Sequence, residues 1–187
     1  SFRIKNTAPL IKDLLRRGAR VVLLAHLEDP ITKKQLSFKS HTVQLSRILG
    51  QGLSFVEEYS RSAVQKGFLK NKVVLLENIR FHKGEEKNDR DFARKLADLA
   101  DMYVNDAFGA SRFPYASIVS VPQLIPSFAG MALNREIESV NSFLSGQAKP
   151  VVLLLGGISL DKKLKFIKKL MPSKGTVLIG GGLSYTF

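Results

Sequence analysis

The stretch VVLLENIRFHKGEEKNDRDFARKLADLADMYVNDAFG, residues 73–109, decides the fold of this chain. It begins with Val73 to Leu76, a short apolar run that is typical of a buried parallel strand. From Phe92 to Leu99, apolar residues then recur at the spacing of a helix that is buried on one face. A second strand is predicted from Met102 to Val104. The stretch therefore predicts one strand–helix–strand unit of a parallel α/β sheet.

Polar residues follow both strands of this unit. Glu77 and Asn78 come directly after the first strand, and Arg80 lies in the loop beyond them. Asn105 and Asp106 follow the second strand. Because ligands of open parallel sheets bind outside the carboxyl ends of the strands, we expect the functional site at this edge.

The rest of the chain repeats the alternation of strands and helices. Further strands are predicted at residues 21–24, 53–56, 151–155 and 177–179, and further helices at 2–17, 37–49, 61–66, 129–144 and 161–171. Residues 109–127 contain three prolines and are predicted to be irregular, because proline disrupts the interior of a helix. The predicted fold class is α/β: a parallel Rossmann-like sheet with helices on both faces, followed by the start of a second, similar domain.

The charge of the chain is its unusual property. Lys and Arg number 29 against 16 Asp and Glu, which gives a net charge of +13. Such a surplus favours polyanionic partners such as RNA or DNA, and the alternative is a basic, solvated surface. On the predicted helix 161–171 the candidate contacts for a polyanion are Lys162, Lys165, Lys168 and Lys169, whose alternative is a solvated helix face.

Composition limits the other classes of protein. No apolar run approaches the roughly 20 residues of a membrane-spanning helix, so no membrane span is predicted. The absence of cysteine excludes disulfides and thiolate ligands. The three histidines show no metal-ligand spacing, so we expect no metal site.

Four basic residues that are expected at strand ends, where ligands of such sheets lie, are candidates for phosphate binding: Arg3, His26, Arg80 and Arg112. Arginine suits phosphate and carboxylate groups because its planar fork donates two parallel hydrogen bonds. The alternative for each arginine is a solvated surface charge. Glycine runs after two predicted strands are a weak phosphate-loop signal, and a tight turn is the alternative. These runs are Gly156-Gly157 and Gly180-Gly181-Gly182.

Three segments, LLENIRFH at 75–82, GEEKND at 84–89 and YVNDAFG at 103–109, resemble the phosphoglycerate kinase family in order and spacing. The resemblance covers essentially the whole chain. It implies an acid-substrate domain at 1–128, an interdomain helix and linker at 129–150, and the incomplete start of a nucleotide domain at 151–187. It also implies phosphoryl transfer between 1,3-bisphosphoglycerate and ADP. By the same resemblance, Arg3, His26 and Arg80 correspond to substrate-side residues, and Lys163 and the glycine runs to nucleotide-side residues.

The chain departs from the family pattern in both halves of the implied site. Glu28-Asp29 stands where the family has Gly-Arg, and Arg112-Phe113-Pro114-Tyr115 stands where it has His-Arg-Ala-His. Arg112 could replace the second arginine by a shift of one position. Ser159 stands where a lysine would steady the transferring phosphoryl group. Each lost donor of this kind costs about 2.7–4 kcal/mol of transition-state stabilisation.

These departures predict a pseudoenzyme: a phosphoglycerate kinase-like fold reused as a non-catalytic structural or binding subunit, in an organellar assembly that contains RNA. Its expected partners are protein subunits and RNA or DNA, with no cofactor. The alternative is an active phosphoglycerate kinase that uses ADP or ATP with Mg, located in the cytoplasm. A third hypothesis is a sensor that binds nucleotide or sugar phosphate without transferring phosphate. The short GEEKND loop and the basic charge favour a plastid or mitochondrial location.

Overall fold

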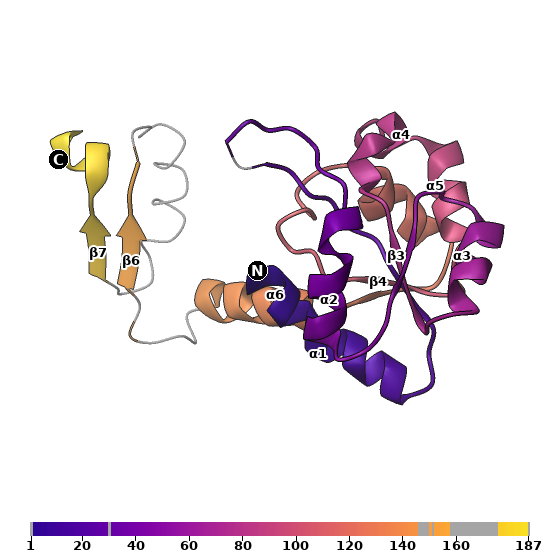
Figure 1. The fold of residues 1–187 in the computed structure, drawn as a ribbon. Helices are drawn as coiled ribbons and strands as arrows, with labels where there is room; N and C mark the ends of the chain where they lie inside the picture. The colour runs from indigo at the N-terminus through magenta and orange to yellow at the C-terminus, as the bar shows by residue number, and fades with distance from the viewer. Residues whose placement is uncertain (1, 30, 146–149, 151, 158–175, 187) are drawn as a thin grey trace. The chain divides into compact units, whose positions relative to one another are not determined.

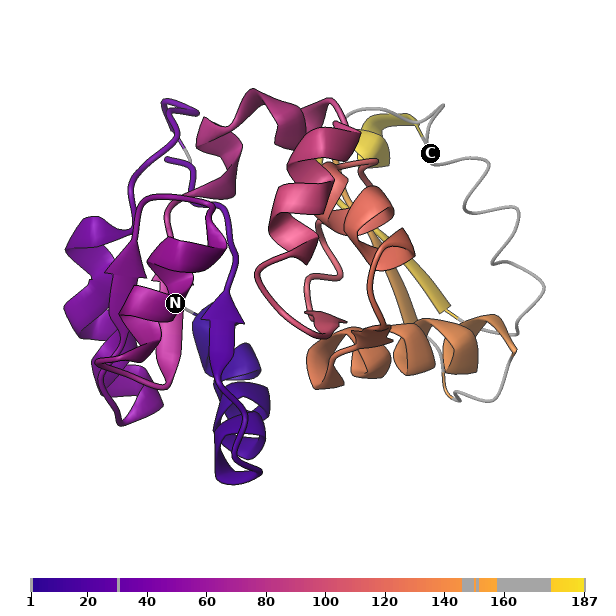
Figure 2. The same ribbon diagram turned by 90° about the vertical axis from the view of Figure 1, so that its right-hand side faces the viewer.

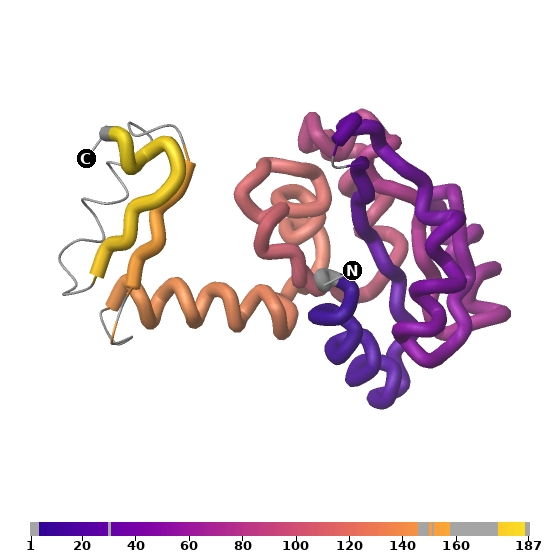
Figure 3. Tube along the Cα trace, turned by 60° about the vertical axis from the view of Figure 1, so that its left-hand side comes forward, coloured from indigo at the N-terminus to yellow at the C-terminus, as the bar shows by residue number. Residues whose placement is uncertain are grey.

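The computed structural model describes residues 2–29, 31–145, 150, 152–157 and 176–186 (Figure 1). They fall into two compact units, Ser1–Asn134 and Arg135–Phe187. The division lies inside helix α6 (Met131–Leu144), which Figure 3 traces as one unbroken helix. This division between the units falls within the predicted interdomain segment 129–150. The division into three predicted domains remains a prediction.

The first unit is built on a three-stranded parallel sheet with the order β1-β3-β2. These strands are β1 (Val21–Leu23), β2 (Ser54–Val56) and β3 (Val73–Leu76), and the central strand β3 pairs with both neighbours. All four residues of β3 are buried, as its unbroken apolar run predicts. The sequence prediction of a parallel α/β sheet is therefore confirmed.

Alternate residues of β3 pack on opposite faces of the sheet. Val73 packs with α1 (Phe2–Arg16), and Leu75 packs on the same face with α2 (Thr42–Leu49). Val74 and Leu76 pack in a different core with α3 (Arg61–Phe68) and α5 (Arg90–Ala97). Successive side chains of a strand point to opposite faces, so this alternation produces a three-layer αβα arrangement.

The remaining elements of the first unit follow the chain. They are η1 (Lys39–His41), η2 (Ile79–Phe81), α4 (Lys83–Glu86), β4 (Tyr103–Asn105), the π-helical turn η3 (Ala116–Ser120), η4 (Val121–Gln123) and β5 (Ser127–Ala129). Asp89 caps the N-terminus of α5: its Oδ1 accepts a hydrogen bond of 2.7 Å from the backbone N–H of Phe92. Such a cap satisfies a backbone donor that the first turn leaves open.

The prediction that residues 109–127 are irregular is wrong in part. Helical turns η3 and η4 occupy 116–123, and Pro122 lies at the start of η4, where its missing N–H costs no helical hydrogen bond. The segment also leads into β5, a strand that the sequence did not predict and that pairs parallel to β4.

The second unit contains two parallel strands, β6 (Val152–Leu155) and β7 (Thr176–Ile179), which run side by side in Figure 2. The 3-10 turn η5 (Gly181–Thr186) follows β7. Both strands were predicted, whereas the predicted basic helix at 161–171 lies outside the described residues. Among the helices that the structure describes, none is long and apolar enough to cross a membrane.

Candidate functional site

The carboxyl ends of β1 and β3 are joined by a buried asparagine. Asn78, whose exposed fraction is 0%, follows β3 and donates from Nδ2 to the backbone oxygens of Leu27 at 2.7 Å and Leu36 at 2.8 Å. Its Oδ1 accepts from the backbone N–H of Arg80 at 3.1 Å. One side chain thus fixes both ends of the loop after β1 and the start of η2.

Glu77 fixes the same edge from the neighbouring position. Its carboxylate accepts hydrogen bonds from the Ser37 hydroxyl at 2.6 Å and from the backbone N–H groups of Phe38 at 3.0 Å and Asn78 at 2.7 Å. Burial raises the pKa of Glu77, but the Ser37, Asn78 and Phe38 hydrogen bonds outweigh it and hold the pKa below its ordinary value. Glu77 is therefore a structural carboxylate, whose two oxygens already accept three hydrogen bonds from the chain.

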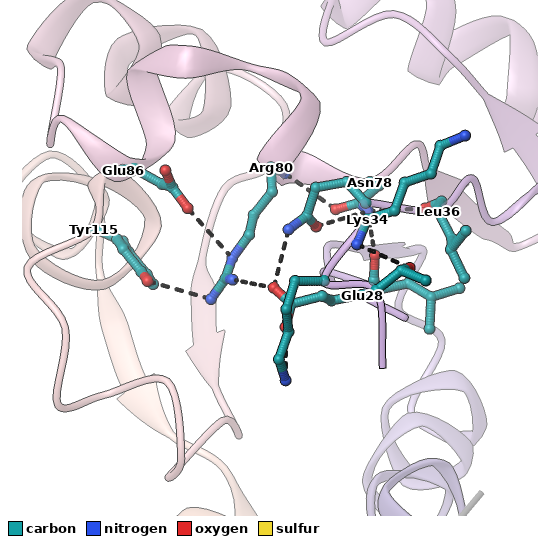
Figure 4. A network of polar contacts seen from close by, with 11 residues as sticks. Glu28, Lys34, Leu36, Asn78, Arg80, Glu86 and Tyr115 are labelled. Carbon is teal, nitrogen blue, oxygen red and sulfur yellow. Dashed lines mark hydrogen bonds and ion pairs between the residues drawn. The ribbon is translucent and has the colours of Figure 1, made fainter. Parts of the chain in front are cut away.

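Arg80 lies at this edge with its guanidinium turned toward three acceptors of the same chain (Figure 4). Nη1 lies 3.4 Å from Glu28 Oε2, Nη2 donates to the Tyr115 hydroxyl at 3.2 Å, and Nε lies 4.0 Å from Glu86 Oε1. The Arg80 side chain is only 14% exposed. The predicted phosphate-binding arginine is thus at the predicted edge, where it already contacts an anion.

The loop after β1 holds Glu28 in place. Glu28 forms an isolated antiparallel bridge with Gln35, whose Nε2 donates to Glu28 Oε2 at 3.1 Å. Asp29 Oδ1 accepts from the backbone N–H groups of Ile31 and Thr32. The Thr32 and Ile31 hydrogen bonds hold the pKa of Asp29 below its ordinary value. Asp29 therefore acts as a turn-forming residue of this loop.

Two stacked aromatic rings lie between the predicted phosphate-binding residues Arg80 and Arg112. The Arg112 guanidinium lies 4.5 Å from the ring centroid of Phe113, and Phe113 stacks on Tyr115 at 5.1 Å. The Arg80 guanidinium lies 5.1 Å from the Tyr115 ring. Arg112 thus packs on Phe113, and Arg80 packs on Tyr115. The sequence did not predict either role.

Glu85 is the one buried carboxylic acid among the described residues. It accepts from the Ser117 hydroxyl at 2.6 Å and from the Ser117 backbone N–H at 3.0 Å. Burial raises its pKa, and the Ser117 hydrogen bonds offset this only in part. Burial also raises the pKa of Tyr103 to about 12, with a smaller contribution from Glu85. These groups join α4 to η3 and stabilise the segment that carries Tyr115.

A family model described as phosphoglycerate kinase matches residues 1–187. The chain belongs to the phosphoglycerate kinase family. It is 40% identical over 189 residues to a phosphoglycerate kinase of Dictyoglomus turgidum and 38% identical over 190 residues to one of Borrelia garinii subsp. bavariensis. Each alignment covers 99% of this chain and 48% of the relative. The chain therefore spans about half the length of the curated relatives that it matches.

Solved phosphoglycerate kinases have the same fold. The enzyme structure from Pyrococcus horikoshii matches with a TM-score of 0.81 and 28% identity, covering 98% of this chain and 50% of that one. The structure from Coxiella burnetii matches with a TM-score of 0.77 and 28% identity, covering 97% and 46%. The predicted family and the predicted αβα fold class are both confirmed.

The other predicted phosphoglycerate kinase positions are distributed over the two units. Arg3 lies on α1, where the structure describes only its backbone, and His26 follows β1 at the same edge as Arg80. Gly156-Gly157 follows β6 and Gly180 follows β7, and the N–H of Gly180 donates to the Leu155 oxygen at 2.8 Å. Outside the described residues lie Ser159, Lys162, Lys163, Lys165, Lys168 and Lys169.

The glycine runs of the second unit approach each other closely. Gly157 and Gly181 have φ of 111° and 66°, and a Cβ on Gly181 would lie 3.4 Å from the backbone N of Gly157. Glycine permits these backbone conformations, and glycine-rich turns of this kind suit phosphate binding. In the part of the chain that the structure describes, no cluster of three or more His, Cys, Asp or Glu residues could hold a metal ion.

Proposed function

We propose that the protein containing this chain transfers a phosphoryl group between 1,3-bisphosphoglycerate and ADP, and that the first unit supplies the acid-substrate side. The observation that carries this proposal is the position of Arg80: a guanidinium at the carboxyl end of the central strand, in a chain that matches the family model throughout. Arginine at such an edge suits a carboxylate or phosphate group of the substrate.

The second unit would supply the nucleotide side. In the runs Gly156-Gly157 and Gly180 to Gly182, backbone N–H groups other than that of Gly180, which donates to the Leu155 oxygen, would hold nucleotide phosphates, and Lys163 would add a positive charge. ADP or ATP with Mg would provide the phosphoryl acceptor or donor. In such transfers the protein positions the substrates and stabilises the developing charge. The arginines would therefore be the main contribution of this chain to catalysis.

A second candidate function is the non-catalytic one, and the contact between Glu28 and Arg80 favours it. A carboxylate lies where the substrate anion would bind, and Asp29 and Phe113 replace family arginines. In this case the chain would act as a structural or binding subunit. The net charge of +13 supports RNA, DNA or an acidic protein as its partner.

A coupled assay of full-length protein with 3-phosphoglycerate and ATP separates the two candidates. The first predicts turnover that falls by roughly 100-fold or more in Arg80→Ala, because a charge-stabilising donor is lost, but not in Arg47→Ala, whose residue is exposed on α2. The second predicts no turnover in the natural protein and a gain of turnover in the Asp29→Arg, Ser159→Lys double variant. It also predicts RNA binding whose affinity falls steeply with salt.

A further inference from the structure

The carboxylate of Glu28 is held from two sides. On one side Arg80 Nη1 lies 3.4 Å from Oε2. On the other side Gln35 Nε2 donates to the same oxygen at 3.1 Å, and Lys33 Nζ lies 3.7 Å from Oε1. The loop therefore positions Glu28 through its own residues, and Arg80 receives an anion that the chain itself supplies.

The backbone of this loop is paired in a way that keeps Glu28 at the edge. The N–H of Leu36 donates to the Leu27 oxygen at 2.9 Å, and the N–H of Asp29 donates to the Lys34 oxygen at 2.9 Å. The N–H of Lys33 donates to the Asp29 oxygen at 3.0 Å. These bonds form a narrow hairpin-like loop, and Figure 4 shows Glu28 reaching from it toward Arg80.

Glu28 differs from the other carboxylate near Arg80. Glu86 lies 4.0 Å from Arg80 Nε and is 59% exposed, whereas Glu28 is 30% exposed and closer to the guanidinium. An exposed ion pair at this distance contributes little because water screens it. Glu28 is therefore the anion that competes for Arg80, and Glu86 provides a matched control.

We propose that Glu28 is a specificity-determining residue: its carboxylate occupies the anion position of Arg80, and a phosphorylated organic acid binds there only by displacing it. The identity of this ligand rests on the proposed function, but the competition between Glu28 and an external anion does not. The site thus admits ligands whose anionic group binds Arg80 better than a carboxylate already held by Gln35 and Lys33.

Calorimetric titration of full-length protein with 3-phosphoglycerate tests this competition. Glu28→Gln keeps the size of the side chain and one acceptor oxygen but removes its charge. We expect it to bind on the order of 10-fold more tightly than the natural protein, because a like-charged neighbour of the ligand has been removed. Glu86→Gln should change the affinity by less than about twofold. Affinity in Glu28→Gln equal to or weaker than that of the natural protein would overturn the proposal.

A readout without any ligand separates this proposal from the proposed function. Phenylglyoxal modifies accessible arginines, and mass spectrometry of the peptide containing Arg80 measures the rate. We expect this rate to rise severalfold in Glu28→Gln and to stay unchanged in Glu86→Gln. If neither protein binds 3-phosphoglycerate, a raised rate still supports the competition, and an unchanged rate overturns it. Should Glu28→Gln fail to fold, Glu28→Asp, which is one methylene shorter, should give the same rise.

Discussion

Two polar networks lie side by side after β3, and they are built differently. The Asn78 network, formed by Asn78 with Leu27, Leu36 and the Arg80 backbone, is buried and consists of neutral hydrogen bonds. The Arg80 contact, formed by the Arg80 side chain with Glu28, Tyr115 and Glu86, is charged and partly exposed. The first network shapes the edge of the sheet, and the second holds at that edge the charged group for which we propose that an external anion competes.

The two networks also differ in the free energy that is lost when one partner is removed. Removing a partner from a buried hydrogen bond leaves a polar group without water, which costs about 1–3 kcal/mol for each group. A partly exposed ion pair can be replaced by water or by another ion at a cost of about 1 kcal/mol or less. The same strand end therefore combines a rigid support with an exchangeable contact.

The largest effect is expected from Asn78→Ala. This change removes the donor to the Leu36 oxygen, one of the two donors to the Leu27 oxygen and the acceptor of the Arg80 N–H, so the free energy of unfolding should fall by about 3 kcal/mol. Urea denaturation followed by circular dichroism measures it. The control Asn141→Ala, on the exposed side of α6, should change it by less than about 0.5 kcal/mol. Equal effects would show that Asn78 is not the support of this edge.

The change in unfolding free energy caused by Glu77→Gln should be the next largest, and it should depend on pH. The pKa of Glu77 lies below its ordinary value of 4.5 in the folded protein, so its ionised form stabilises the fold above that pH. At neutral pH the variant should lose about 2 kcal/mol of unfolding free energy, since the hydrogen bonds involve a charged acceptor.

This difference between Glu77→Gln and the natural protein should shrink as the pH falls below about 4.5, where the unfolded state takes up the proton first. Denaturation series at several pH values measure it. Glu138→Gln, an exposed change on α6, serves as the control and should show no such trend. A difference that is constant from neutral pH down to pH 3 would contradict the assignment.

Glu28→Gln should have a smaller effect on stability. The Glu28 pair is partly exposed and Gln can keep the hydrogen-bonding role, so the unfolding free energy should change by less than about 1 kcal/mol. The same denaturation experiment measures it. A loss as large as that of Asn78→Ala would mean that the Arg80 contact is a structural support rather than an exchangeable one.

Tyr115→Phe should have the smallest effect. It removes the hydroxyl that accepts from Arg80 Nη2 at 3.2 Å but keeps the ring that stacks on Phe113. Water can replace this acceptor at a partly exposed position, so we expect a change of about 0.5 kcal/mol or less. Thermal unfolding measures it, and a shift in melting temperature larger than that of Glu28→Gln would reverse the order expected within the Arg80 contact.

The sequence predicted the elements that depend on local patterns. The apolar run of β3 and the placement of Arg80 after a strand both follow from residues that are close in the chain. Strand β5 and the helical turns at 116–123 were missed, because the three prolines within residues 109–127 dominate the local pattern. Pairing with β4 and packing of Ala116 and Val121 in the core override that pattern.

The partners of the candidate site were beyond prediction from local sequence. Glu28 was noted as a departure from the family, and Tyr115 as part of an altered segment, but neither was assigned to Arg80. They are separated from Arg80 by 52 and 35 positions in the chain. An acidic residue beside a basic one at the same predicted edge was the only signal, and it does not specify which groups meet.

By itself, the sequence determined the family, the αβα fold class and the position of Arg80 at the end of a buried strand, because these depend on motifs, on hydrophobic periodicity and on neighbouring residues. Only the tertiary structure decided that Arg80 contacts Glu28 and Tyr115, and that Asn78 joins two loops. Such contacts depend on how the loop after β1 and the segment before η3 come together over β3, and side chains far apart in the chain meet only when the sheet and its helices are packed.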